Sequence, residues 1–388
     1  MNPNRFEKAP RALLLTFAAS LIAMSGIELV LPSLPLMQEA LGLSDSAIVL
    51  VMTVYLLPGV VVTIPAGAVA DAFGTRRVLV FALTGLGLTG IGLFFARSLP
   101  VVLGLRLIQG LCAGAIAPLT IAYIGALTDG LRQLRAQAKR SLLMTLGSAA
   151  LPALGGLVAS AHWSGPFALQ ALALPVAFAL WRVRPLNRPA VRPKFALIPA
   201  RPDRHVMSVH VLSLIRFVAL YAFLTFLPLA LARFGFSPLE VGLWLGASAG
   251  LGAIVALAAS GLAQRLRPSA LMQAGLVVAG LGLALMAPGG SPLWLIAGGL
   301  VFGTGDGLHG VLQNSFLTRV GKAATRNSTV AVAAMAKNLG KVFGPGLVLL
   351  TGGALGHTLV FAALGLGICL SAALPAMLRP YDDAVVGR

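Results

Sequence analysis

Apolar runs about as long as a bilayer is thick follow one another along this chain, and short basic gaps separate them. A membrane-spanning helix needs about 20 consecutive apolar residues. Only 10% of the residues are charged and 58% are hydrophobic, which excludes an ordinary soluble domain. Dividing the runs at their Gly, Pro and charged residues predicts an all-α membrane protein with twelve transmembrane helices, near residues 12–36, 46–70, 77–96, 99–124, 141–161, 166–183, 207–232, 238–263, 269–287, 291–315, 328–352 and 356–378.

The basic residues between these runs predict the orientation of the chain. Almost all of them fall on the side of the N-terminus, whereas Arg97 and Arg233 fall on the other. Cytoplasmic loops carry an excess of Lys and Arg, so we expect a multi-pass protein of the inner membrane with both termini in the cytoplasm. The net charge of +18 then reflects orientation, and we expect no nucleic-acid partner. Cys112 and Cys369 lie in apolar runs, which predicts neither a disulfide nor a metal site.

A basic, proline-rich stretch divides the twelve helices into six and six. We therefore expect two pseudo-symmetric bundles, residues 1–181 and 207–388, joined by a basic cytoplasmic linker at 182–206. The spacing of Gly147 and Pro152 in the first half resembles that of Gly340 and Pro345 in the second. Internal repeats of this kind are typical of transporters, whose substrate site lies at the interface of the repeats.

Two carboxylates, Glu28 and Asp306, fall deep inside the predicted spans. A charge at the centre of a bilayer costs at least about 2.5 kcal/mol, and intramembrane ionisable residues commonly serve function. These two residues are the first candidates for a functional site.

The turn between the second and third predicted helices carries a recognisable motif, Gly67-Ala68-Val69-Ala70-Asp71-Ala72-Phe73-Gly74-Thr75-Arg76-Arg77. It resembles the loop signature of the major facilitator superfamily, Gly-x-x-x-Asp-Arg-x-Gly-Arg-Arg. Ala72 and Thr75 depart from that signature. The resemblance implies a gating role for Gly67, Asp71, Gly74, Arg76 and Arg77. The alternative is a basic cytoplasmic turn without such a role.

Two further helices carry motifs of the same superfamily. Arg106, Gln109 and Gly110 resemble its Arg-x-x-Gln-Gly motif on the fourth helix. An arginine cannot lose its proton there, so it needs an acid, carbonyls or water, and a structural hydrogen-bond hub is the alternative role. In the fifth helix, Gly147, Pro152, Gly155 and Gly156 resemble the gating element of the antiporter branch, with Leu151 in place of its first Gly. Glycine and proline are also common in any membrane helix.

The first helix supplies the most specific resemblance. Glu28 precedes a Leu31-Pro32-Ser33-Leu34-Pro35 run, and drug:proton antiporters of the superfamily place an Asp before a run of this kind. Desolvation favours the neutral carboxyl and a nearby arginine favours the ionised one, so a balance of the two permits proton exchange. Glu28 lies about 12 Å and Arg106 about 10 Å from the outer ends of their helices, so we expect them to meet.

The second half repeats this arrangement. Arg216 and Asp306 each lie about 14 Å from the inner ends of their helices. Asp306, His309 and Gln313 are spaced to share one helical face, which we expect to point into a central cavity. Lys337 and Lys341 are one turn apart and are expected to compete for Asp306. The alternative is an ion pair that only stabilises helix packing.

The resemblance implies a secondary active transporter that exports small molecules by proton antiport. It requires no cofactor beyond the proton gradient, and its partners are a small-molecule substrate, protons and the bilayer; we expect a monomer. We assign proton coupling to Glu28, Arg106 and Asp306, and substrate binding to Glu28, Gln109, Arg216, Asp306, His309 and Gln313.

Two alternatives differ in direction and in class. The first is uptake or facilitated diffusion of an anionic metabolite held by Arg106, Arg216 and Lys337. The second is an intramembrane aspartyl protease, because Gly303-Thr304-Gly305-Asp306 matches the Gly-x-Gly-Asp motif of such enzymes. Protease chemistry needs two carboxylates sharing a proton, and no other Asp lies in a predicted span, so we expect a transporter and no enzyme.

Overall fold

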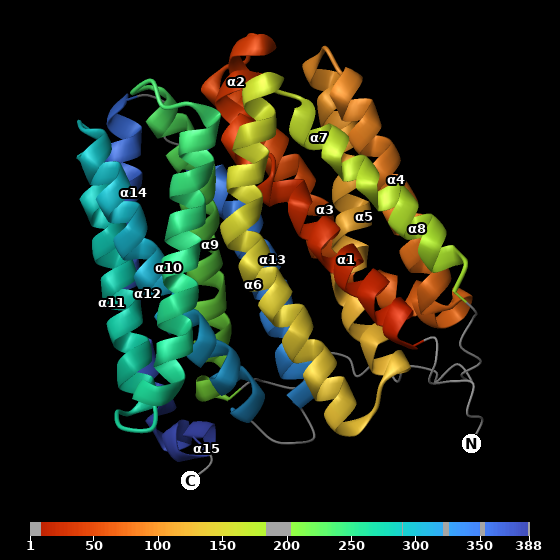
Figure 1. Cartoon of the computed structure of the whole chain (residues 1–388). Helices are drawn as coiled ribbons and strands as arrows, with labels where there is room; N and C mark the ends of the chain where they lie inside the picture. Colours follow the sequence, from red (N-terminus) through yellow and green to blue (C-terminus); the bar gives the residue numbers. More distant parts are fainter. Residues whose placement is uncertain (1–8, 184–202, 289, 321–325, 350–353, 387–388) are drawn as a thin grey trace. The chain divides into compact units, whose positions relative to one another are not determined.

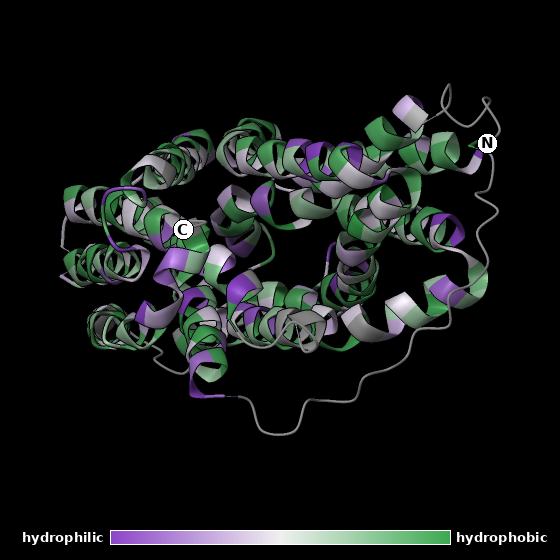
Figure 2. Ribbon diagram, turned by 90° about the horizontal axis from the view of Figure 1, so that it is seen from below, coloured by the Kyte–Doolittle hydropathy of each residue, from purple (hydrophilic) through white to green (hydrophobic). Residues whose placement is uncertain are grey.

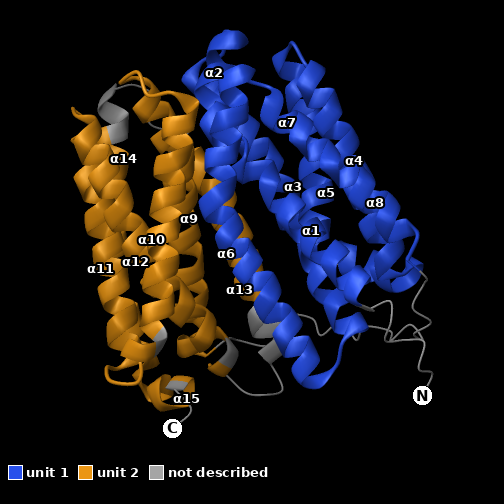
Figure 3. Ribbon diagram, viewed as in Figure 1, with its two compact units in different colours: residues 1–194 blue, residues 195–388 orange. Residues whose placement is uncertain are grey.

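The computed structural model describes residues 9–183, 203–288, 290–320, 326–349 and 354–386. The chain divides into two compact units, unit 1 from Met1 to Lys194 and unit 2 from Phe195 to Arg388 (Figure 3). Their boundary falls inside the stretch expected to be a linker, 182–206. Most of that stretch, residues 184–202, lies outside the described residues.

Helices build unit 1 (Figure 1). In chain order they are α1 (Ala9–Glu28), η2 (Leu31–Ser33), α2 (Leu34–Ala40), α3 (Asp45–Phe73), α4 (Thr75–Phe95), α5 (Leu99–Leu127), α6 (Gly130–Ala161), α7 (Gly165–Leu169), η3 (Gln170–Leu172) and α8 (Ala173–Trp181), where η marks a short 3₁₀ helix.

Unit 2 is helical as well. Its elements are α9 (Arg204–Ala232), α10 (Pro238–Leu262), α11 (Pro268–Met286), α12 (Pro292–Arg319), α13 (Arg326–Leu349), α14 (Ala354–Ser371), η5 (Leu374–Tyr381) and α15 (Asp382–Val386). Over the residues that the structure describes, each of the twelve predicted ranges overlaps one of these helices or a run of consecutive helical segments.

The long helices have the composition of membrane spans. Within the described residues, ten are long and apolar enough to cross a bilayer, and Gly165–Trp181 forms a shorter apolar segment. Figure 2 shows hydrophobic residues predominating on the helices of both units. The predicted fold class, an all-α protein that crosses the membrane several times, is confirmed.

The fifth span differs from its expected bounds. We predicted residues 141–161, whereas α6 runs from Gly130 to Ala161 over 32 residues. A helix of that length extends about 48 Å, well beyond the roughly 30 Å of the hydrocarbon core. The basic residues that we placed in a loop therefore lie on the first turns of α6, and Arg140 Nε donates to Ser20 Oγ of α1 at 2.9 Å.

The two units repeat one pattern of helix pairing. In unit 1, α5 packs against α1, α3 and α4, and α6 and α8 pack against α1 and α4 respectively. In unit 2, α12 packs against α9, α10 and α11, and α13 and α14 pack against α9 and α11. Equivalent helices thus have equivalent neighbours, as expected for an internal repeat.

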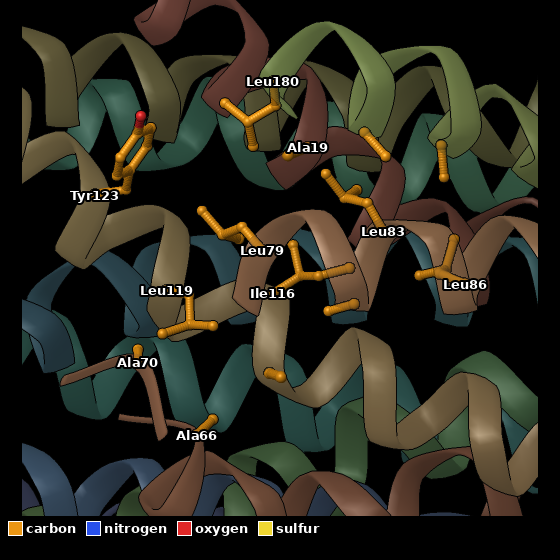
Figure 4. Packing of buried hydrophobic residues seen from close by; sticks show 14 residues of the cluster. Ala19, Ala66, Ala70, Leu79, Leu83, Leu86, Ile116, Leu119, Tyr123 and Leu180 are labelled. Carbon is orange, nitrogen blue, oxygen red and sulfur yellow. The ribbon is translucent and has the colours of Figure 1, made fainter. Parts of the chain in front are cut away.

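Small and large apolar residues fit together in the core of unit 1 (Figure 4). Ala66 and Ala70 of α3 belong to the same buried cluster as Leu79 of α4 and Leu119 of α5. Small residues at such contacts are typical of membrane bundles, where close packing replaces the hydrophobic effect as the main attraction between helices.

Candidate functional site

The first span is broken at Glu28, where we expected one continuous helix over 12–36. α1 ends at Glu28, and Pro32 has no N–H to bond the Glu28 carbonyl four residues earlier. Val30 N–H donates to Ile27 O at 2.9 Å and Ser33 N–H to Val30 O at 3.0 Å, which are bonds of 3₁₀ type. The Gly26 carbonyl, which Val30 N–H would bond in a regular α-helix, is left for another donor.

Arg106 of α5 is that donor. Its Nη1 donates to Gly26 O at 3.0 Å and to Gln109 Oε1 at 2.8 Å, and its Nη2 contacts Met52 Sδ at 3.7 Å. The side chain is fully buried. Its guanidinium carbon lies 4.7 Å from the ring centre of Tyr55 and 5.1 Å from that of Phe167. A carbonyl, an amide and two aromatic faces therefore stabilise the buried cation.

Glu28 lies two residues beyond Gly26 and is partly exposed. Arg106 therefore binds the backbone at the end of α1 that carries this carboxylate. Direct pairing of the Glu28 carboxylate with the guanidinium stays a prediction.

A second amide extends this cluster. Gln109 Nε2 donates to Gln170 Oε1, and both side chains are fully buried. Gln170 begins η3, where the sixth span changes from α7 to α8. We did not identify Gln170 from the sequence, although it is the one amide in an apolar run from Pro166 to Leu180, and that signal was available.

Glycines of α6 fit against this part of the first span. A Cβ at Gly155 would overlap the carbonyl oxygen of Leu29, and a Cβ at Gly147 would lie 2.5 Å from the Leu21 side chain. Pro152 and Gly156 are buried in the same helix. The predicted gating element of the fifth helix thus packs on the break in the first. Its gating role stays a prediction.

The loop motif is partly engaged in contacts. Gly74 has φ +91°, a conformation that favours glycine, and it ends α3. Nη1 of Arg76 donates to the carbonyls of Leu180, Trp181 and Val183 at the end of α8. The remaining three residues of the motif are Gly67, where a Cβ would meet open space, and the exposed Asp71 and Arg77.

In unit 2, Arg216 of α9 and Asp306 of α12 form a two-pronged ion pair. Arg216 Nε donates to Asp306 Oδ1 at 2.6 Å and Nη2 donates to Oδ2 at 2.8 Å. Each side chain is 16% exposed. The guanidinium lies where a Cβ of Gly310 would be, so this glycine leaves room for the pair. The structure brings together the two residues that the sequence placed at the same depth.

His309 and Gln313 have a different environment from Asp306. Both are buried, and Gln313 Nε2 donates to Ser213 Oγ of α9 at 2.9 Å. Of the three residues that we expected on one face toward a central cavity, only Asp306 is partly exposed. Substrate binding by His309 and Gln313 stays a prediction.

The lysines of α13 lie close to the same ion pair. Lys337 Nζ donates to Asn314 Oδ1 at 3.0 Å. The Nζ atoms of Lys337 and Lys341 each lie 5.7 Å from the ring centre of Phe217, and the guanidinium carbon of Arg216 lies 5.2 Å from it. Three basic side chains therefore surround one phenyl ring.

The glycines of the protease-like motif have a packing role. A Cβ at Gly303 would overlap Ser248 of α10, and a Cβ at Gly305 would overlap the backbone of α11 at Ala279. Within the described part of the chain, no group of three His, Cys, Asp or Glu could hold a metal ion, and Cys112 and Cys369 are free thiols.

Comparison with known sequences gives relatives that carry exporter or resistance names. The chain is 29% identical over 154 residues to the bacillibactin exporter of Bacillus subtilis, a match that covers 38% of each chain. It is 31% identical over 192 residues to a chloramphenicol resistance protein of Pseudomonas aeruginosa, covering 47% of this chain and 44% of the relative. Multidrug resistance protein 1 of Bacillus subtilis is 24% identical over 234 residues, covering 60% and 58%. The matched regions thus span less than two thirds of these relatives.

Solved structures match over nearly the whole chain. A bacterial homolog of the human lysosomal transporter Spinster, inward-facing and occupied, has a TM-score of 0.75 at 14% identity and covers 99% of this chain and 97% of its own. The inward-open xylose transporter XylE of E. coli has a TM-score of 0.75 at 15% identity, with coverage of 95% and 96%. At such low identity, these likenesses establish the fold alone.

The family model of the Major Facilitator Superfamily matches residues 16–345, which is most of the chain. Together with the helical repeat and the loop motif, this match shows that the protein is a membrane transporter and not an enzyme, and that it belongs to the Major Facilitator Superfamily.

Proposed function

We propose that the protein exports small molecules by proton antiport, with Glu28 as the proton-carrying group. The observation that carries this proposal is the break at the end of α1. There a partly exposed carboxylate lies two residues from a carbonyl that a fully buried arginine holds. An intramembrane carboxylate beside a permanent cation has a protonation state that depends on small changes in its surroundings.

Protonation of Glu28 from outside would remove its negative charge and release a cationic substrate or a hydrogen-bonded one. Loss of the proton to the inside would restore the charge and permit the next substrate to bind. Arg106 would stabilise the ionised carboxylate without itself titrating, because its guanidinium keeps its proton at ordinary pH. Asp306 is already neutralised by Arg216, which makes it the weaker candidate for this role.

The names of the relatives support the direction of transport. An exporter and two resistance proteins share 24–31% identity with parts of this chain. We also propose that the transporter is a monomer in the inner membrane with both termini cytoplasmic. Labelling of a cysteine placed at Arg97 from the cytoplasmic side only would contradict that orientation.

The test compares Glu28→Gln with Glu39→Gln in energised inverted vesicles. Glu39 is exposed on α2 of the same span and serves as the matched control. We expect that addition of ethidium, chloramphenicol or puromycin dissipates the proton gradient in the parent and the control and leaves it intact in Glu28→Gln. Loss of response to ethidium alone would place Glu28 in substrate binding; loss with all compounds would place it in proton coupling. A parent that dissipates no gradient contradicts antiport.

A second candidate function, transport of a small organic anion, has one observation in its favour. Arg216, Lys337 and Lys341 surround the ring of Phe217. A carboxylate or phosphate group would be attracted by such a cluster. Salicylate in the same compound panel discriminates the two functions. If only salicylate moves, and cells accumulate it as the imposed gradient rises, the export proposal is wrong.

A further inference from the structure

Two of the spans in unit 1 are interrupted, and one buried arginine is connected to both interruptions. The first span breaks after Glu28, and the sixth changes to a 3₁₀ turn at Gln170–Leu172 between α7 and α8. A stretch of 3₁₀ helix within a longer helix often marks a hinge. Arg106 bonds the first break directly through Gly26 O, and it reaches the second through Gln109 and Gln170.

Arg106 fixes the direction of the whole chain of hydrogen bonds. A guanidinium has donors only, so the Gln109 amide must present its oxygen to Arg106. Its nitrogen is then left to donate to the oxygen of Gln170. All three side chains are fully buried. Within the described residues, Arg106 Nε and Gln170 Nε2 have no hydrogen-bond partner. Neither amide can reverse its orientation while Arg106 keeps its present contacts.

The turn that carries Gln170 is closely packed against α4. A Cβ at Gly90 would lie 2.8 Å from the Phe167 carbonyl oxygen and 3.0 Å from Gln170 Cβ. Phe167 also presents its ring to the Arg106 guanidinium. A shift of the guanidinium therefore disturbs this turn at two places, through the amide pair and through the aromatic ring.

We propose that Gln170 is a positioning residue, through which the state of Arg106 sets the geometry of the hinge in the sixth span. When the guanidinium turns toward an ionised carboxylate on the first span, it withdraws from Gln109. The Gln109 amide is then free to turn, and its bond to Gln170 is lost. A buried amide that loses its partner is strongly unfavourable, so the hinge takes another arrangement. The link between Arg106 and the hinge stands independently of the proposed antiport, whereas its use in coupling rests on it.

Hydrogen–deuterium exchange of the full chain in lipid nanodiscs tests the link. The variants are Gln109→Leu, Gln170→Leu and the double variant. Gln273→Leu is the control, because Gln273 Nε2 bonds the Ala372 carbonyl within unit 2 at 2.9 Å. We expect amides 168–174 to exchange about tenfold faster in both single variants than in the parent. The double variant should exchange no faster than either single variant, and the control should exchange at the rate of the parent. Equal rates in Gln109→Leu and the parent, or additive effects in the double variant, would overturn the proposal.

Transport measured against pH separates positioning from a purely structural role. We expect Gln170→Leu to shift the pH profile of proton-coupled efflux. Gln273→Leu, which breaks a bond to a backbone carbonyl within unit 2, should retain the parent profile. If Gln170→Leu does not fold, Gln170→Asn, whose shorter side chain cannot reach Gln109, replaces it. An unchanged profile in these disrupting variants overturns the proposed role. Coupled exchange without any proton-driven transport contradicts the antiport and leaves the link standing.

Discussion

The two units place an arginine on different helices of the repeat and give it different partners: Arg106 lies on α5, the counterpart of α12, and Arg216 lies on α9, the counterpart of α1. In unit 1, Arg106 is fully buried and donates to a backbone carbonyl and a neutral amide. In unit 2, Arg216 is partly exposed and forms a two-pronged pair with the carboxylate of Asp306. The helices pair in the same pattern in both units, so helix pairing alone does not explain the ion pair of Arg216 with Asp306.

This difference separates an adaptable site from a fixed one. A guanidinium held by neutral acceptors can exchange one acceptor for another without separating an ion pair. A guanidinium already bonded to both oxygens of a carboxylate has much more to lose. We therefore propose movement and coupling for unit 1 and a steadier, structural ion pair for unit 2.

The largest expected effect comes from breaking the ion pair of unit 2. Asp306→Ala leaves Arg216 without its carboxylate, and we expect the free energy of unfolding to fall by about 3 kcal/mol. Removing both charges, in Asp306→Leu with Arg216→Leu, should restore most of that loss. Arg106→Leu should cost less, because the hydrogen bonds that it loses to Gly26 O and Gln109 Oε1 have neutral acceptors. Denaturant titration in detergent measures all of these variants.

A double-variant cycle of Asp306→Leu, Arg216→Leu and the two together decides whether the ion pair of unit 2 is the fixed element. If the coupling energy between Asp306 and Arg216 is below about 0.5 kcal/mol, the pair is not the fixed element that we infer. If Arg106→Leu is as costly as Asp306→Ala, the two arginines do not differ in the manner that the structure indicates.

An intermediate effect is expected at the glycines that seat the fifth helix of each unit. A Cβ at Gly155 would overlap the Leu29 carbonyl, and a Cβ at Gly344 would lie 2.5 Å from the Val218 carbonyl. Overpacking of this kind costs about 1–3 kcal/mol, so both Gly155→Ala and Gly344→Ala should lower the melting temperature. Gly67→Ala, which would meet open space, should not.

The two substitutions should differ in transport. Gly155 packs on the break beside Glu28, whereas Gly344 packs on the continuous helix α9. We expect proton-driven efflux to fall in Gly155→Ala beyond what its loss of folded protein explains. Equal efflux per folded molecule in both variants would contradict a special role for the first break.

Much of the fold could be predicted from the sequence, because hydrocarbon length and basic flanks leave distinct marks on a chain. The break after Glu28 could not. Pro58, Pro65, Pro118 and Pro152 all lie inside uninterrupted helices, so a proline in an apolar run does not reveal whether the helix ends there. Whether neighbouring groups satisfy the freed carbonyls decides the outcome, and those groups are distant in sequence.

The candidate site was predictable to the same degree. Depth along the helix correctly matched Arg216 with Asp306, and the spacing of Arg106 and Gln109 brought them onto one face. Helical spacing does not reveal which side of α12 another helix covers, so it could not predict that His309 is buried. Gln170 joins Gln109 across 61 residues of sequence, a contact that no local pattern contains.

The third helix of each unit is tied to the end of the sixth, with opposite charges. In unit 1, the cation of Arg76 bonds carbonyls at the end of α8. In unit 2, the buried carboxylate of Asp382 accepts from Ser269 N at 2.8 Å and from Ser269 Oγ at 2.7 Å, at the start of α11. A helix start favours an anion and a helix end favours a cation, so each tie has the charge that its helix end stabilises.

The smallest effect is expected when this tie is removed. Asp382→Ala leaves the first turn of α11 without its carboxylate, and we expect a loss of about 1 kcal/mol, as for removal of a helix cap. Asp383→Ala is the matched control, because the neighbouring carboxylate is exposed. Hydrogen exchange at amides 269–272 should accelerate in the first variant and not in the second. Equal exchange in Asp382→Ala and Asp383→Ala would mean that the charge near the helix start, and not the bond to Ser269, supports α11. Ser269→Ala then distinguishes these causes, because it removes the hydroxyl donor and leaves both charges in place.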